Sequence, residues 1–277
     1  MLFKNSLSLN SYINNLPRGP VGLVPTMGSI HKGHIKIIRK SLNENLYTIV
    51  SIFVNPTQFD EFEDYINYPR DTKADIKILN SINKNILIYT PKSSDLYGDN
   101  VQHDLFNFDG LDLIMEGSFR KNHFNGVATV VKKLILKFNP LNIYFGEKDF
   151  QQMVIIKNLL IKENLNTNLI SCKTVRDKSG LALSSRNSRL SEREKIEASL
   201  IYKTLEEVKS KFKYLNEKKI NEYVYNKLKN TNCKIEYFFI LNEETLKPNK
   251  KITNHNKYRA FIAVRLGKIR LIDNIKL

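Results

Sequence analysis

The chain has 277 residues, of which 42% are hydrophobic and 26% charged, which is typical of a globular protein with one large core or two modest ones. No apolar run approaches the roughly 20 residues of a membrane span, no charged segment leads into a long apolar one at the N-terminus, and two cysteines cannot form a disulfide framework. We therefore expect a cytoplasmic protein with reduced thiols and no membrane partner.

The formal net charge of +16 has three possible explanations. Nucleic-acid binding is one, and attraction of small anionic substrates is another. The third is a lysine-rich composition that places lysines on every solvated face. The lysines are scattered and are not clustered with stacking aromatic residues, so we favour the third explanation and expect no nucleic-acid partner.

Short apolar runs alternate with helical patterns through the first 175 residues. Strands are predicted at 21–25, 46–54, 86–89, 142–145 and 169–175, and helices near 7–16, 34–45, 71–82, 126–138 and 150–162. Residues 56–69 and 92–125 are predicted to be loops. This alternation predicts an α/β fold with a Rossmann-like, doubly wound parallel sheet, in which ligands bind at the carboxyl ends of the strands.

The pattern changes after Val175. Ser191 and Glu194 have the spacing of a capping box at the start of a helix over 192–213. A second helix is predicted at 218–230, and strands are predicted at 235–240, 260–264 and 269–272. Residues 176–277 are therefore expected to form a smaller C-terminal α+β domain.

The most informative stretch is residues 24–34, VPTMGSIHKGH, which lies between a predicted buried strand and a predicted helix. Gly28 and Gly33 lack a Cβ, so the backbone can come close to a ligand, and the helix dipole favours an anion at this end. His31 and His34 can each donate a hydrogen bond to a phosphate oxygen. The stretch therefore indicates a phosphate-binding turn.

Two other interpretations of the histidine pair stay open from the residues alone. The pair is also consistent with a helix start that carries two surface histidines. A metal pair is the second alternative, although the common zinc motif spaces its histidines four apart around a glutamate, which is missing here. The position directly after a buried strand favours nucleotidyl transfer.

Residues 25–28 (PTMG) and 31–34 (HKGH) resemble the signature of the pantothenate synthetases, or pantoate–β-alanine ligases, in the superfamily of HIGH-motif nucleotidyltransferases. Three further blocks agree with this family in order and spacing, namely 53–59 (FVNPTQF), 145–152 (FGEKDFQQ) and 183–187 (LSSRN). Thr57 and Phe150 stand where the family usually has methionine and tyrosine, and neither change removes a polar catalytic group.

The resemblance implies an ATP-dependent ligase that condenses (R)-pantoate with β-alanine to give pantothenate. The pantoate carboxylate would attack the α-phosphate of ATP to give pantoyl adenylate and pyrophosphate, and the amine of β-alanine would then displace AMP. The resemblance further implies Mg²⁺ with the ATP, small-molecule partners and a homodimer. Residues 1–175 would bind nucleotide and pantoate, and residues 176–277 would close over the site.

The family's functional residues carry over to matching positions of this chain. The implied catalytic residues are His34, His31 and Lys148, with the lysine as a mobile charge between phosphates and carboxylate. The implied ATP-binding residues are Met27, Gly28, Ser29, Ile30, His31, Lys32, Gly33, His34, Gly146, Glu147, Lys148, Asp149, Val175, Leu183, Ser184, Ser185 and Arg186.

The implied pantoate-binding residues are Gln58, Gln152, Asn55, Arg120 and His123. Asp75 resembles an acid near the magnesium ion, but it is equally well explained as an acidic residue favoured by the helix dipole. Two rival functions remain open, namely a nucleotidyltransferase with another acceptor and a basic RNA-binding module. The two glutamines and the Gly-Glu-Lys-Asp block argue against the first, and the scattered lysines argue against the second.

Overall fold

The computed structural model describes residues 1–248 and 257–277. Within them the chain divides into two compact units. The N-terminal unit contains residues Met1–Glu147 and Gln151–Lys173, and the C-terminal unit contains Lys148–Phe150 and Thr174–Leu277. Across the described residues, no helix has the length and apolar character needed to cross a bilayer.

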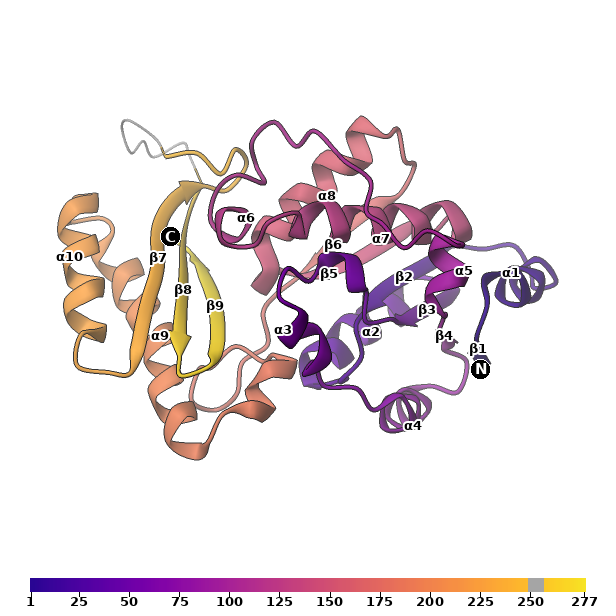
Figure 1. The fold of residues 1–277 in the computed structure, drawn as a ribbon, viewed down its shortest axis with the longest axis horizontal. Coiled ribbons are helices and arrows are strands. Elements are labelled where there is room, and N and C mark those ends of the chain that lie inside the picture. The colour runs from indigo at the N-terminus through magenta and orange to yellow at the C-terminus, as the bar shows by residue number, and fades with distance from the viewer. Residues whose placement is uncertain (249–256) are drawn as a thin grey trace. The chain divides into compact units, whose positions relative to one another are not determined.

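The N-terminal unit is built on a six-stranded sheet in the order β1-β4-β3-β2-β5-β6, in which all pairs are parallel (Figure 1). Its strands are β1 (Leu2–Phe3), β2 (Val21–Thr26), β3 (Tyr47–Ile52), β4 (Leu87–Tyr89), β5 (Asn142–Gly146) and β6 (Asn168–Cys172). The central strands β2 and β3 are almost entirely buried, as expected for a parallel sheet that is covered on both faces.

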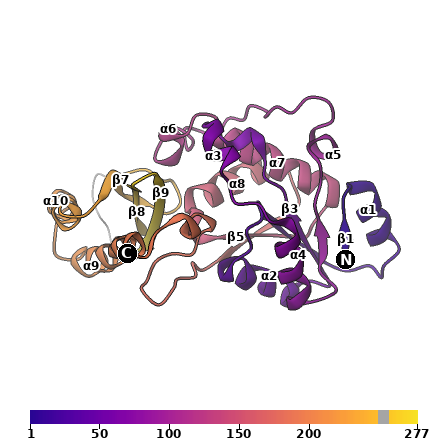
Figure 2. The ribbon, with the colours of Figure 1, turned by 60° about the horizontal axis from the view of Figure 1, so that its bottom comes forward.

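Helices cover both faces of this sheet (Figure 2). One face packs against α2 (Lys32–Glu44) and α4 (Thr72–Ile82), whose buried Ile38 and Leu79 join the strand side chains in one apolar cluster. The opposite face packs against α7 (His123–Phe138) and α8 (Phe150–Lys162). The remaining helices of this unit are α1 (Ser6–Asn14), η1 (Pro56–Gln58), α3 (Phe62–Ile66), α5 (Ser93–Tyr97) and α6 (Glu116–Phe119). The short helix η2 (Glu147–Asp149) begins in this unit, and its last two residues belong to the C-terminal unit.

The Rossmann-like class predicted from the sequence is confirmed, and α8 has the predicted bounds. The prediction of unstructured loops at 56–69 and 92–125 was wrong, because η1, α3, α5 and α6 lie in these segments. Each of these helices has five residues or fewer, which is too short to show a 3.6-residue period. The edge strand β1 was also not predicted, because its two residues are too few to show the alternating pattern of a strand.

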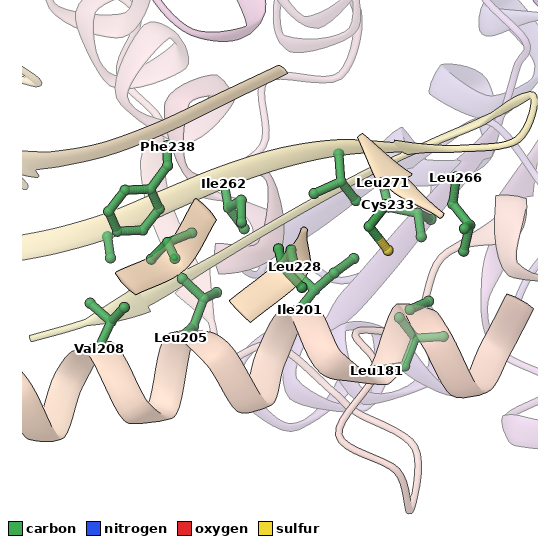
Figure 3. Close-up of a cluster of buried hydrophobic side chains, with 14 of the residues drawn as sticks. Leu181, Ile201, Leu205, Val208, Leu228, Cys233, Phe238, Ile262, Leu266 and Leu271 are labelled. Atoms are coloured by element: carbon green, nitrogen blue, oxygen red, sulfur yellow. The ribbon is translucent and has the colours of Figure 1, made fainter. Parts of the chain in front are cut away.

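The C-terminal unit is a three-stranded antiparallel sheet, β7 (Cys233–Asn242), β8 (Tyr258–Leu266) and β9 (Ile269–Lys276), packed against α9 (Glu192–Lys211) and α10 (Glu217–Leu228). Figure 3 shows Ile201, Leu205 and Val208 of α9 facing side chains of the strands. The capping box predicted at Ser191 and Glu194 is present at the start of α9. A short helix, η3 (Ser185–Arg189), precedes it.

Both cysteines are buried and free. Burial raises the pKa of the Cys172 thiol to about 11 and also raises the pKa of the Cys233 thiol. With a pKa near 11, about 0.1% of the Cys172 side chain is thiolate at pH 8, and the thiolate is the reactive form.

We therefore expect neither thiol of the native protein to react with an aromatic disulfide reagent at pH 8. Both should react once guanidinium unfolds the chain, which serves as the control for reagent and thiol count. Rapid labelling of one or two thiols per native chain, followed by absorbance, would contradict this expectation.

Candidate active site

The turn after β2 has a backbone shape that depends on one buried carboxylate. Gly28 and Ser29 have positive φ values of 82° and 51°, a region that non-glycine residues rarely adopt. Asp75 of α4 is 3% exposed, and its two carboxylate oxygens accept hydrogen bonds from Ser29 N at 2.9 Å and Ile30 N at 2.7 Å. A Cβ on Gly28 would lie 2.8 Å from Asp75 Oδ2. The carboxylate therefore fixes the turn that leads into α2.

His31 and His34 form a reciprocal cap at the start of α2. His31 Nδ1 accepts a hydrogen bond from Gly33 N at 3.1 Å, and His34 Nδ1 accepts one from His31 N at 3.3 Å. The two rings lie side by side, with centroids 4.0 Å apart. Because Nδ1 is the acceptor in both rings, the neutral imidazoles carry their protons on Nε2. Both histidines thus have an Nε2–H donor at a helix N-terminus.

Polar side chains of the segment after β3 face this turn. Gln58 Nε2 donates to the Met27 sulfur at 3.0 Å, and Asn55 Nδ2 donates to Gln58 Oε1 at 3.2 Å and to the Gly126 carbonyl at 3.1 Å. Asn55 is 1% exposed and Gln58 is 8% exposed. The structure thus brings together Met27, Asn55 and Gln58, which belong to two separate sequence blocks.

Arg120 and His123 hold the backbone of the same segment. His123 Nδ1 lies 2.8 Å from the Gln58 carbonyl, and Arg120 Nη1 lies 3.0 Å from His123 Nε2. Since a carbonyl can only accept, His123 donates from Nδ1 in this contact. These two predicted site residues are therefore brought to Gln58, and they contact its main chain.

Tyr97 is a neighbour of this cluster that the sequence did not indicate. Its hydroxyl donates to Asn55 Oδ1 at 2.5 Å, and burial raises the pKa of Tyr97 to about 12. The hydroxyl therefore stays protonated at neutral pH and keeps the Asn55 amide in one orientation. Tyr97 lies in α5, inside a segment predicted to be a loop, so no periodicity pointed to it.

The two adjacent glutamines after β5, Gln151 and Gln152, lie in different environments. Gln151 is buried, and its amide donates to the Leu111 and Ile114 carbonyls at 2.8 Å each. Gln152 is partly exposed, and its side chain makes no hydrogen bond within the described part of the chain. The Gln151 amide thus stabilises the fold through its two hydrogen bonds to main-chain carbonyls. The Gln152 amide has no such structural hydrogen bond and can bind a ligand. Earlier in the same segment of the chain, Lys148 Nζ lies 3.2 Å from Asp149 Oδ1.

The predicted site residues of the C-terminal unit lie on a hairpin and the short helix that follows it. Leu183 N donates to the Val175 carbonyl at 2.9 Å, so these two residues are paired. Ser184 is the N-cap of η3, where its hydroxyl accepts from Arg186 N at 3.3 Å. The capping role considered for this block from the sequence is therefore present, and it involves the Arg186 main-chain N–H.

The described residues fit a magnesium ion only in a limited way. They contain no group of three or more His, Cys, Asp or Glu side chains that could hold a metal ion. Both oxygens of Asp75 already accept backbone N–H groups, although each keeps a second lone pair. Mg²⁺ commonly uses one or two carboxylates together with water and substrate phosphates, and this chain suits that mode.

Within the N-terminal unit, the Asn55 and Gln58 amides form an uncharged cluster that reaches Met27, four residues before the first of the two imidazole donors. Such an arrangement can orient a small hydroxylated acid through its amides and stabilise negative charge through the helix N-terminus and the Nε2–H groups. No general base or nucleophile of the chain is needed for a reaction in which the substrate carboxylate itself attacks a phosphate.

Comparison with known proteins agrees with this geometry. The family model described as pantoate-beta-alanine ligase matches residues 2–276. The chain belongs to the pantoate-beta-alanine ligase family. It is 42% identical over 280 residues to the pantothenate synthetase of Flavobacterium psychrophilum, covering 100% of this chain and 99% of that protein. It is 45% identical over 258 residues to that of Christiangramia forsetii, covering 93% and 91%.

Solved structures of the family share the whole fold. The pantothenate synthetase of Thermus thermophilus superposes with a TM-score of 0.90 at 32% identity, covering 99% of this chain and 98% of that chain. The pantoate-beta-alanine ligase of Francisella tularensis, complexed with beta-gamma ATP and beta-alanine, gives a TM-score of 0.82 at 36% identity and covers 100% and 97%. The predicted family and fold class are therefore confirmed.

The hydrogen bonds of Asp75 give a test of its structural role. Replacing Asp75 with Asn puts an NH₂ group against a backbone N–H, so that one buried donor of the turn loses its acceptor. We expect the free energy of unfolding to fall by about 1–3 kcal/mol, measured by guanidinium unfolding.

Asp71→Asn is the matched control, because Asp71 caps the same helix by accepting from Ala74 N and asparagine caps equally well. If Asp75→Asn unfolds at the same denaturant concentration as Asp71→Asn, then Asp75 does not hold the turn.

Proposed function

We propose that this protein condenses pantoate with β-alanine in an ATP-dependent reaction through a pantoyl-adenylate intermediate, releasing pyrophosphate and AMP. The observation that carries the proposal is the Gly28–His34 turn, where two imidazoles cap a helix, while the Gln58 amide, held by Asn55, reaches Met27 at the start of this turn. Family membership, with relatives at 42% and 45% identity over most of the chain, supports the same reaction.

In the first step a pantoate carboxylate oxygen forms a bond to the α-phosphorus of ATP, and the bond from that phosphorus to the bridging oxygen of pyrophosphate breaks. Negative charge builds on the phosphate oxygens and on the leaving group. We assign the His31 and His34 Nε2–H groups, the helix N-terminus and Lys148 to this charge. The backbone of residues 27–33 would approach the nucleotide, since Gly28 has no Cβ.

Pantoate would be held by groups that donate and accept hydrogen bonds without carrying charge. We assign its hydroxyls and carboxylate to the Gln58 and Gln152 amides, with Asn55 orienting Gln58. Arg120 and His123 support the site by binding the Gln58 main-chain carbonyl, which holds the segment 55–58 in a fixed position. Uncharged amides bind the carboxylate without lowering its reactivity as a nucleophile as much as a guanidinium would.

In the second step the neutral amine of β-alanine attacks the acyl carbon, AMP leaves with the electrons of the broken C–O bond, and the nitrogen gives up one proton to water as the amide forms. We assign Ser184, Ser185 and Arg186 to the pyrophosphate that leaves in the first step, which they would bind through hydroxyl and guanidinium contacts. Val175 and Leu183 would contact the nucleotide. In this assignment residues 1–175 bind nucleotide and pantoate, and residues 176–277 supply the pyrophosphate contacts.

Three further features belong to the proposal. Mg²⁺ would neutralise phosphate charge and would bind mainly through phosphates and water, with Asp75 as the candidate acid beside it. The protein would act as a homodimer in the cytoplasm, with small molecules as its only substrates.

The direct test is AMP release by purified protein with Mg²⁺, ATP, pantoate and β-alanine, with each component omitted in turn. We expect AMP only when both organic substrates are present. AMP formation that is independent of pantoate, with another carboxylic acid as acceptor, would replace the ligase by a different nucleotidyltransferase.

The two catalytic assignments can be tested by truncation. His34→Ala removes a transition-state donor, and Lys148→Ala removes a mobile positive charge. Each should lower the rate of adenylation by about 100- to 1000-fold with little change in melting temperature. His103→Ala and the exposed Lys157→Ala are matched controls outside the site and should keep the native rate. A near-native rate in either truncated variant would remove that residue from the mechanism.

The pantoate assignment predicts a selective effect on one substrate. Gln58→Ala removes a side chain that we assign to the acid and not to the nucleotide. The KM for pantoate should rise by about 10-fold or more, while the KM for ATP should change by less than about threefold. The exposed Gln102→Ala serves as the control. Equal increases in both KM values would refute the assignment.

A further inference from the structure

The tripeptide Lys148–Phe150 follows β5 in the chain but belongs to the C-terminal unit by its contacts. One of these contacts is a hydrogen bond of 2.9 Å from Asn274 Nδ2, on β9, to the main-chain carbonyl of Lys148. The two residues are 126 positions apart in the sequence. The residue proposed above to supply a mobile charge is therefore held by a side chain of the last strand.

The orientation of the Asn274 amide is fixed by its other partner. Asn274 is 3% exposed, and its Oδ1 lies 2.6 Å from Nη1 of Arg259 on β8. A guanidinium can only donate, so the atom facing it must be the amide oxygen. The amide nitrogen is thereby directed to the Lys148 carbonyl, which can only accept. The assignment of oxygen and nitrogen thus follows from the chemistry of both neighbours.

Arg259 is itself immobilised on three sides. Its Nε and Nη2 each lie 2.8 Å from Glu243 Oε1, it is 6% exposed, and its guanidinium carbon lies 4.1 Å from the centroid of the Phe150 ring. A charged pair this well buried is costly to disturb, because removing one partner leaves the other without compensation. The linked side chains of Glu243, Arg259 and Asn274 therefore form a rigid group, which we call the Glu243–Arg259–Asn274 support.

This support holds the tripeptide at both ends. Asn274 binds the carbonyl of Lys148, while Arg259 and Phe261 pack on the ring of Phe150, with the two phenyl centroids 5.8 Å apart. The lysine side chain has a flexible four-carbon stem, and its ammonium nitrogen lies 3.2 Å from Asp149 Oδ1. Fixing its main chain restricts where its ammonium group can reach.

We propose that Asn274 is a positioning residue for Lys148, and that it acts through the Glu243–Arg259–Asn274 support to place the lysine for adenylation. The proposal rests on the role given to Lys148 in the proposed function. A displacement of about 1 Å at a catalytic group can cost on the order of 100-fold in rate, so the loss of one main-chain hydrogen bond is enough to matter.

The test is a double-mutant cycle read by pantoate-dependent exchange of labelled pyrophosphate into ATP. Asn274→Ala removes both contacts, and Asn274→Asp keeps the acceptor for Arg259 but removes the donor to Lys148. Each should lower the exchange rate by about 10- to 100-fold in the native background and by less than about twofold in Lys148→Ala, because residues that act through one another are not additive.

Ile262→Val is the matched control for a purely structural effect. Ile262 is fully buried on β8 and belongs to the core that packs against α9 and α10 (Figure 3). This variant should lower the melting temperature while leaving the exchange rate unchanged. In the substrate-free, full-length protein, hydrogen exchange of the amides of residues 147–150 should accelerate in Asn274→Ala and not in Ile262→Val.

The results of these experiments distinguish the positioning role of Asn274 from the catalytic role of Lys148. An equal loss of exchange rate in both backgrounds, or unchanged protection of residues 147–150, would overturn the positioning role while the role of Lys148 stands. A native exchange rate in Lys148→Ala alone would overturn the lysine's role and, with it, this inference.

Discussion

The hydrogen bonds between the Asp75 carboxylate and the backbone of Ser29 and Ile30 are the contacts on which the candidate site depends. A turn with two successive positive φ values is unfavourable for a residue such as Ser29, and it persists only where surrounding groups hold it. The buried carboxylate does so from the neighbouring helix α4. Because the turn is held in this way, His31 and His34 begin α2 with both Nδ1 atoms accepting backbone hydrogen bonds, which places the ring protons on Nε2.

The remaining groups come together through the geometry of parallel strands. β2, β3 and β5 run in the same direction, so the segments that follow them emerge at one edge of the sheet. This places Met27 beside Gln58, although 31 residues separate them. In the C-terminal unit, adjacent residues of β9 hold two other candidate segments. Asp273 pairs with Arg176 of the hairpin before Ser184, and Asn274 binds the Lys148 carbonyl.

Local sequence features predicted much of the fold, but they could not identify the supporting contacts of the site. The buried strands, the helix Phe150–Lys162 and the capping box of Ser191 and Glu194 depend on neighbours within a few residues, and all three were predicted. The contacts of Asp75 and Asn274 join residues 45 to 126 positions apart, for which a single sequence carries no periodic signal. That His34 and Lys148 act on ATP stays a prediction, which rests on the family motifs.

The central claim is that pantoate is activated as an adenylate before β-alanine reacts. Labelled pyrophosphate should therefore enter ATP when the native protein is given Mg²⁺, ATP and pantoate without β-alanine, and omission of pantoate should abolish the exchange. Formation of AMP from the complete mixture without any pantoate-dependent exchange, under conditions where pyrophosphate rebinds, would contradict a reversible adenylate and would require a concerted reaction in its place.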